Sequence, residues 1–270
     1  MIRFAAALAI FLMAPRVMAC QLSLDGPAKQ GGLLIGTVTP GASVQVDGQA
    51  VRVSPDGHFL VGFGRDAKSK AKVEAVMADG RRLGCPVSVA RRSYQIQRID
   101  GLPKRQVTPD PKALARIRAD NAAIRAVRKL DTASTDFLAG FDWPLKGRIS
   151  GIFGSQRVLN GQPRSPHNGV DIAAPTGTPI HAPAPGVVRL VHPDMFYTGK
   201  SIMLDHGHGL TSVYVHMSAI SVKEGQRVAK GDVIGKVGKT GRATGPHLHW
   251  GVSLFATHLD PMLLVGAMRK

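Results

Sequence analysis

Residues 245–251 read Gly-Pro-His-Leu-His-Trp-Gly, and this stretch decides how the second half of the chain is interpreted. Successive side chains of a strand point to opposite faces, so His247 and His249 share one face and Leu248 lies on the other. Two neighbouring imidazoles are unfavourable when they are buried without partners. A metal ion removes that cost, and histidine is a common zinc ligand. The pattern predicts a strand with a metal-binding face and with Trp250 in the core.

Two further groups place histidine in the same half of the chain. Residues 166–172 read Pro-His-Asn-Gly-Val-Asp-Ile, and residues 213–217 read Val-Tyr-Val-His-Met. In an extended strand His167 and Asp171 would be about 13 Å apart, so the chain must bend between them to bind one ion. Asn168-Gly169 tolerates the positive φ that such a bend requires. Each group alone is a weak signal, and only their combination in one glycine-rich segment is specific.

Together the three groups resemble a known family. The segments PHNGVDIAAPTGTPIHAP, SVYVHMS and GKTGRATGPHLHWGV are similar to the lysostaphin-like, or LytM-type, zinc metallopeptidases. The resemblance implies one zinc ion held by three side chains, namely His167, Asp171 and His249. It also implies two catalytic histidines, His216 and His247. The implied fold is a β-rich groove with the metal at its floor, and the implied substrates are peptide cross-links of bacterial peptidoglycan.

The chemistry of these residues agrees with the resemblance. Two histidines and one carboxylate leave the fourth zinc position for a water molecule, as catalytic sites require. Glutamate serves as the base of many zinc peptidases, yet the chain has only Glu74 and Glu224, and neither lies in a histidine motif. Histidine titrates near neutral pH and can take that role. We assign His247 to activating the water and His216 to orienting it and stabilising the oxyanion, and these two assignments are interchangeable.

The segment 141–264 is predicted to form one mostly antiparallel β-domain, because it is rich in glycine and has almost no helical periodicity. Its strand-like runs are Ile149–Phe153, Gly186–Val191, Ser201–Asp205, Leu210–Val215, Val233–Val237 and His247–Val252. A further motif, Asp205-His206-Gly207-His208, is interpreted as a strand end and turn rather than as a second metal site. Residues 265–270 are expected to form a basic tail.

The first half of the chain has a different pattern. Residues 20–97 contain short alternating runs such as Ser43–Asp47, separated by turn pairs such as Asp56-Gly57. This spacing predicts a small β-sandwich of immunoglobulin-like type with a binding or spacer role. The overall fold class is therefore mostly β.

Residues 98–140 are predicted to link the two β-domains. A helix is expected over residues 111–130, because Thr108-Pro109-Asp110-Pro111 is a helix-start signal. One face of this helix is apolar and the others are basic. The apolar positions are Leu114, Ile117, Ile124 and Val127. We expect the helix to pack on a neighbouring domain.

Residues 1–19 read MIRFAAALAIFLMAPRVMA and are typical of an export signal. A positive residue precedes an apolar run that is too short to span a bilayer. We therefore expect an exported protein of the periplasm or cell envelope. Cys20 follows the expected cleavage site and has two interpretations: a disulfide with Cys85, which we favour, or a lipid anchor as in bacterial lipoproteins.

The formal net charge of +17 comes from 35 Lys and Arg against 18 Asp and Glu, spread along the chain. Such a surface attracts an anionic partner. Combined with an export signal, the charge favours anionic envelope surfaces. Nucleic acid is not expected as a partner, because aromatic residues that could stack on bases make up only 5% of the chain.

Three residues near the motifs are candidate substrate contacts: Arg164, Arg242 and Thr244. Arginine side chains in loops beside a groove can pair with substrate carboxylates. Two functions remain open from the sequence. The leading one is an exported zinc endopeptidase that cleaves peptidoglycan cross-links, and the other is a non-catalytic LytM-like domain that binds cell wall or activates another hydrolase. Because all five motif positions are filled, we favour catalysis.

Overall fold

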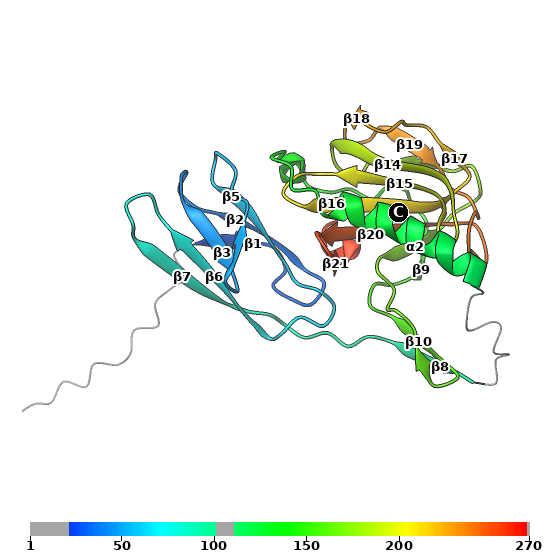
Figure 1. The fold of residues 1–270 in the computed structure, drawn as a ribbon, viewed down its shortest axis with the longest axis horizontal. Coiled ribbons are helices and arrows are strands. Elements are labelled where there is room, and N and C mark those ends of the chain that lie inside the picture. The colour runs from blue at the N-terminus through cyan, green and yellow to red at the C-terminus, as the bar shows by residue number, and fades with distance from the viewer. Residues whose placement is uncertain (1–21, 101–110, 269–270) are drawn as a thin grey trace, which may run out of the picture.

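The computed structural model describes residues 22–100 and 111–268. The predicted export signal at residues 1–19 and Cys20 lie outside these residues, as do 101–110 and 269–270. The mostly β fold class predicted from the sequence is confirmed, with two β-rich bodies and a single α-helix among the described residues (Figure 1). None of the described helices is both long enough and apolar enough to cross a membrane.

The N-terminal body is a sandwich of two sheets around one core. The three-stranded sheet has the order β1-β2-β5 and the four-stranded sheet has the order β4-β3-β6-β7. The strands are β1 (Ser23–Asp25), β2 (Leu33–Thr37), β3 (Ser43–Val46), β4 (Gln49–Val51), β5 (His58–Gly62), β6 (Lys70–Val76) and β7 (Arg82–Ser88). Inward-facing residues such as Val44, Phe59 and Val73 are almost fully buried between the sheets. Cys85 lies in this core and is disulfide-bonded, whereas its expected partner Cys20 lies outside the described residues.

The linker contributes a strand and the helix. β8 (Ile96–Ile99) pairs in parallel with β10 (Gln156–Leu159) of the C-terminal body, so the expected boundary at residue 97 falls inside a strand. The helix α2 spans Pro111–Arg128 and is followed by the 3₁₀ turn η1 (Asp136–Ala139). Only the second half of the predicted apolar face is packed: Val127 is buried, whereas Leu114 is 37% exposed. The first half of the helix makes polar contacts instead: Arg116 pairs with Asp194 of β14 (Gly186–Met195) at 2.7 Å.

The C-terminal body is built on one large, mainly antiparallel sheet with the order β18-β14-β15-β16-β20-β12-β9 and with β21 on β20. Its strands are β9 (Arg148–Gly151), β12 (Val170–Ala173), β14 (Gly186–Met195), β15 (Gly199–Asp205), β16 (Leu210–Met217), β18 (Arg227–Val228), β20 (His247–Leu254) and β21 (Thr257–Leu259). A smaller sheet joins β13 (Pro179–His181), β19 (Val233–Lys236) and β17 (Ala219–Ile220). β10 and β11 (Gln162–Pro163) form a hairpin that carries β8 at its edge.

The two faces of the large sheet have different coverings. Leu248 and Trp250 of β20 are fully buried in the main core. On the opposite face Val213 and Val215 of β16 pack against Val127 of α2. Val215 pairs directly with His249, so α2 lies across the same face that carries the paired histidines (Figure 1). The linker helix therefore partly covers the face of the sheet that carries His247 and His249.

The two bodies are packed against each other. Leu33 and Leu60 of the N-terminal sandwich belong to the main core of the C-terminal body. Arg92 forms an ion pair of 2.8 Å with Asp260, whose side chain is only 3% exposed. Asp260 caps the short 3₁₀ turn η2 (Pro261–Leu263). Residues 265–268 of the expected tail also pack on this body, because the Trp143 indole donates to the carbonyl of Gly266.

Candidate metal centre

The register between β12 and β20 places two residues of the candidate site, Asp171 and His249, directly opposite each other. Asp171 pairs directly with His249, and Ala173 pairs with His247. Along β20 the burial alternates, with His247 and His249 partly exposed and Leu248 and Trp250 buried. The period-two prediction for this strand therefore describes both of its faces correctly.

A bend brings His167 towards the same point. Its amide donates to the Ser155 carbonyl at 2.8 Å, and its carbonyl accepts from the Gly154 amide at 2.9 Å. Its Nδ1 lies 3.1 Å from the carbonyl oxygen of Ile152. A carbonyl can only accept, so Nδ1 carries the proton and Nε2 keeps its lone pair. The loop before β12 thus fixes both the position of the ring and its tautomer.

Three ligand-type atoms converge at this point. His167 Nε2 lies 3.0 Å from Asp171 Oδ1 and 2.9 Å from His249 Nδ1, and the third side, from His249 Nδ1 to Asp171 Oδ1, is 2.8 Å. Within the described residues these side chains form the one group of three that could hold a metal ion. Their side chains are 18–24% exposed, so the centre can be reached from solvent.

The protonation of the group matches what a metal requires. Burial alone would raise the pKa of the Asp171 carboxyl, but its contacts with His167 and His249 outweigh burial and hold that pKa well below its ordinary value. Burial lowers the pKa of His249 although Asp171 is adjacent. An ionised carboxylate and neutral imidazoles are the forms that bind metal ions.

Gly151 makes room for the carboxylate. It is the neighbour of Asp171 on β9, and a Cβ added there would overlap Asp171 Oδ2 and lie 2.9 Å from Cγ. A glycine inside a strand commonly marks such a close approach. This residue was not identified from the sequence, because the pairing of β9 with β12 is not visible there.

His216 reaches the site through a β-bulge. Between the pairs Lys200–Met217 and Ile202–Tyr214, two residues of β16 oppose one residue of β15. His216 also adopts φ +64°, which is uncommon for a residue with a side chain. Bulges beside active sites re-aim side chains. Here the bulge takes His216 out of the alternation that would have turned it towards the core.

His216 and His247 form a second pair next to the three ligand-type atoms. Their ring centroids are 4.7 Å apart, and His247 Nε2 lies 3.9 Å from Asp171 Oδ1. In each ring Nδ1 donates to a carbonyl, that of Thr240 for His216 at 2.8 Å and that of Gly245 for His247 at 2.9 Å. Both Nε2 atoms therefore carry lone pairs. Burial lowers the pKa of His216 to about 4.

The candidate substrate contacts lie in loops beside this centre. Arg242 is exposed, and its guanidinium stacks 4.1 Å from the ring centroid of Tyr197. Thr244 is exposed in the same loop, which also supplies the Thr240 carbonyl. Arg164 is half-buried, and its carbonyl accepts from Gln156 Nε2 at 2.7 Å. Their contacts with a substrate remain predictions.

The motif at residues 205–208 does not join the metal group. Asp205 accepts hydrogen bonds from Thr132 and from the amide of Gly207. His206 is fully buried between the Pro185 carbonyl and the Ser212 hydroxyl. The motif is a strand end and a turn, as interpreted from the sequence.

Comparisons with known proteins agree with this arrangement. The model of peptidase family M23 matches residues 165–261. The peptidoglycan DD-endopeptidase ShyA of Vibrio cholerae is 44% identical over 108 residues, which are 39% of this chain and 24% of ShyA. The DD-carboxypeptidase/endopeptidase Mpg of Neisseria meningitidis is 44% identical over 96 residues, 36% of this chain and 22% of Mpg. The matched region thus spans about a quarter of the length of these curated relatives.

One solved structure is similar over nearly the whole chain. It is a crystal structure of a Pseudomonas aeruginosa protein assigned to peptidase M23, and its sequence is 34% identical. The likeness covers 89% of this chain and 96% of that one, with a TM-score of 0.69. The resemblance predicted from the three histidine motifs is therefore confirmed, and the chain belongs to peptidase family M23.

Proposed function

We propose that this protein is an exported zinc endopeptidase that hydrolyses peptide cross-links of peptidoglycan. The observation that carries the proposal is the convergence of His167, Asp171 and His249 beside the paired rings of His216 and His247. Relatives that share this region are a peptidoglycan DD-endopeptidase and a DD-carboxypeptidase/endopeptidase.

The three converging side chains fit zinc in number, type and spacing. Two imidazoles and one carboxylate are a common set for catalytic zinc, and they leave a position for water or substrate. Ligand atoms around a tetrahedral zinc ion are roughly 3.3 Å apart, because each lies about 2.0–2.1 Å from the metal. The three distances of 2.8–3.0 Å need only a small expansion to reach this value. The Ile152 carbonyl fixes the tautomer of His167, as the outer partners of metal-binding histidines commonly do.

When bound, zinc supplies Lewis acidity, which polarises a carbonyl group and makes a water molecule acidic near neutral pH. His247 acts as the general base: its Nε2 lone pair faces the centre and takes a proton from the attacking water. As the carbon–nitrogen bond breaks, the same imidazole returns that proton to the leaving amine.

His216 orients the water. Its Nδ1 proton is held by the Thr240 carbonyl, so the neutral ring presents Nε2 as an acceptor. Donating a hydrogen bond to an oxyanion would require a second proton on the ring, and the lowered pKa of about 4 opposes this near pH 7. We therefore assign His216 to accepting a hydrogen bond from the attacking water.

The proposed location is the periplasm or cell envelope. The sequence of residues 1–19 supports export, and the disulfide at Cys85 fits an oxidising compartment. The formal charge of +17 suits an anionic envelope surface. Arg164, Arg242 and Thr244 are proposed to contact the peptide stems.

The test is digestion of purified peptidoglycan, followed by separation and mass analysis of the muropeptides. The wild-type protein should convert cross-linked dimers to monomers, and the masses identify the bond cleaved. His247→Ala should abolish this conversion and still bind one zinc per chain by metal analysis. His249→Ala should lose both conversion and zinc.

A matched control is His181→Ala, because His181 is an exposed histidine of the same domain whose ring bonds to the Gly231 carbonyl and does not belong to the metal-binding group. It should retain zinc and activity. If the zinc-loaded wild-type protein leaves the dimers intact, the endopeptidase proposal is wrong. A non-catalytic wall-binding role would then be indicated by co-sedimentation with the same peptidoglycan.

A further inference from the structure

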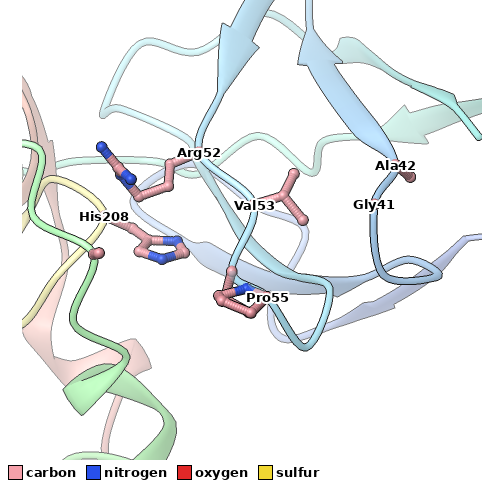
Figure 2. Close-up of a pocket in the computed structure, with 8 residues that line it drawn as sticks. Gly41, Ala42, Arg52, Val53, Pro55 and His208 are labelled. Atoms are coloured by element: carbon pink, nitrogen blue, oxygen red, sulfur yellow. The ribbon is translucent and has the colours of Figure 1, made fainter. Parts of the chain in front are cut away.

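A cavity of about 380 Å³ lies where the N-terminal sandwich meets the C-terminal body (Figure 2). The sandwich contributes the turn after β2 and the segment between β4 and β5. The C-terminal side contributes the turn after β15 and the linker after α2. The lining residues are Gly41, Ala42, Arg52, Val53, Pro55 and His208, with Ser54 and Ala133. A volume of this size accommodates a small organic molecule rather than a single water.

His208 is an unsatisfied polar side chain in the wall of this cavity. The residue is only 3% exposed, and neither ring nitrogen has a hydrogen-bond partner among the described residues. Its amide donates to the Thr132 carbonyl at 2.9 Å, and its ring packs 5.1 Å from that of Phe137. Figure 2 shows the imidazole directed towards Val53 and Pro55. Buried polar groups are nearly always paired, so this ring lacks a partner that the cavity has space to hold.

Arg52 adds a cation to the same wall. Its Nε and Nη2 bind the carboxylate and carbonyl of Asp131, at 2.6 Å and 3.0 Å. Nη1 has no partner among the residues that the structure describes. Burial first, and the positive charge of Arg52 next, lower the pKa of His208 against the opposing charge of Asp131. The ring is therefore neutral near pH 7 and offers one N–H donor beside a guanidinium, which is a suitable pair for an anion.

Most of the remaining wall is made of short apolar side chains from Ala42, Val53, Pro55 and Ala133, and the Ser54 hydroxyl already accepts from the amide of His58. A purely polar anion would leave this part of the cavity without contacts. We propose that the cavity binds a small carboxylate that carries a short apolar group, such as the terminal residue of a peptide, with the carboxylate at His208 and Arg52. Binding would bridge the two bodies, because the residues that contact the ligand come from both.

This site is distinct from the metal centre. His208 precedes β16 and His216 lies near its far end. A strand of that length spans about 23 Å at 3.3 Å per residue. Occupancy of the cavity can therefore be measured independently of zinc binding and of peptidoglycan hydrolysis.

The experiment titrates the full mature protein with acetate, with N-acetyl-D-alanine and N-acetyl-L-alanine, and with inorganic phosphate. Calorimetry gives the affinity, and the histidine ring resonances in ¹H–¹⁵N spectra locate the contact. We expect saturable binding of at least one N-acetylalanine enantiomer, tighter than that of acetate or phosphate, with a shift of the His208 ring signals. The bound ligand should also raise the Tm of the wild-type protein.

Two variants and one control test the assignment. His208→Phe keeps the ring packing but removes both nitrogens, and Arg52→Gln removes the charge; each should weaken binding at least tenfold. The control is His58→Phe, because His58 lies on β5 near the cavity but does not line it. It should bind as the wild type does.

Three results would overturn the proposal. They are the absence of saturable binding, equal affinity in the His208→Phe and His58→Phe variants, and phosphate binding as tightly as N-acetylalanine. If His208→Phe does not fold, Arg52→Gln decides the question alone, and unchanged affinity in that variant also refutes the assignment.

Discussion

Replacing Gly151 by Ala should damage the proposed metal centre without altering any of its three proposed ligands. The added Cβ would overlap Oδ2 of Asp171 and lie 2.9 Å from its Cγ. Carbon atoms in good contact are about 3.5 Å apart, so the carboxyl carbon must move by about 0.6 Å or more. Functional constellations tolerate displacements of only about 0.5 Å. The backbone itself permits alanine, since Gly151 does not have a positive φ.

The expected result is a loss of zinc affinity of about 10- to 100-fold, as for other changes that misplace a metal ligand from outside the ligand set. Affinity is measured by competition with a chromophoric chelator, and urea unfolding of the metal-free protein checks the fold. Gly84→Ala is the matched control, because Gly84 also lies within a strand but has open space around its added Cβ. It should bind zinc as the wild type does.

A Gly151→Ala protein that is folded and binds zinc within about twofold of the wild-type affinity would refute this reasoning. It would mean that β9 shifts outward and leaves Asp171 in place. The close approach of the two strands would then not be needed for the geometry of the site.

Three further results are expected. Arg92→Met leaves the buried Asp260 carboxylate unpaired and should lower the free energy of unfolding by about 3 kcal/mol in urea titrations, whereas Arg81→Met breaks an exposed pair and should have no measurable effect; equal effects would contradict the role of burial. Burial lowers the pKa of His258 to about 4, so folding favours the neutral ring and the stability of the metal-free protein should fall as pH drops from 6.5 to 4. In the His258→Gln variant, the loss in the free energy of unfolding between pH 6.5 and pH 4 should be smaller by up to about 3 kcal/mol. An unchanged pH dependence of stability would contradict the role of His258. Chelating the metal should lower the Tm of the wild type but not that of His249→Ala. An equal decrease in both proteins would show that the effect of the chelator on Tm does not arise from metal bound at this site.

The sequence was sufficient to predict the elements whose signal is local. Alternation in 247–250 predicted both faces of β20, and the turn pairs predicted the N-terminal sandwich. The motif blocks also indicated the family. These features depend on residues close together in the sequence. Their side-chain periodicity or turn-forming residues can therefore be recognised without knowledge of the tertiary structure.

The contacts that complete the site could not be predicted, because they join distant segments. The pairing of Asp171 with His249 depends on strand register, and the Ile152 carbonyl orients His167 only once the loop is closed. His216 occupies a bulge that breaks alternation, and β8 pairs with β10 across about sixty residues. The linker helix buries apolar side chains only in its second half, whereas Arg116 in its first half pairs with Asp194, and apolar periodicity does not distinguish these two kinds of contact.

The loop that holds His167 is itself held from the other side by the linker. The amide of Gln156 donates to the Gln95 carbonyl, and Arg65 of the sandwich donates to the Gly154 carbonyl at 2.8 Å. A Cβ on Gly154 would collide with the ring of Tyr94. The geometry of the metal centre is therefore coupled to docking of the N-terminal half. Before the two halves pack together, the loop that positions His167 lacks its contacts with Arg65, Tyr94 and Gln95.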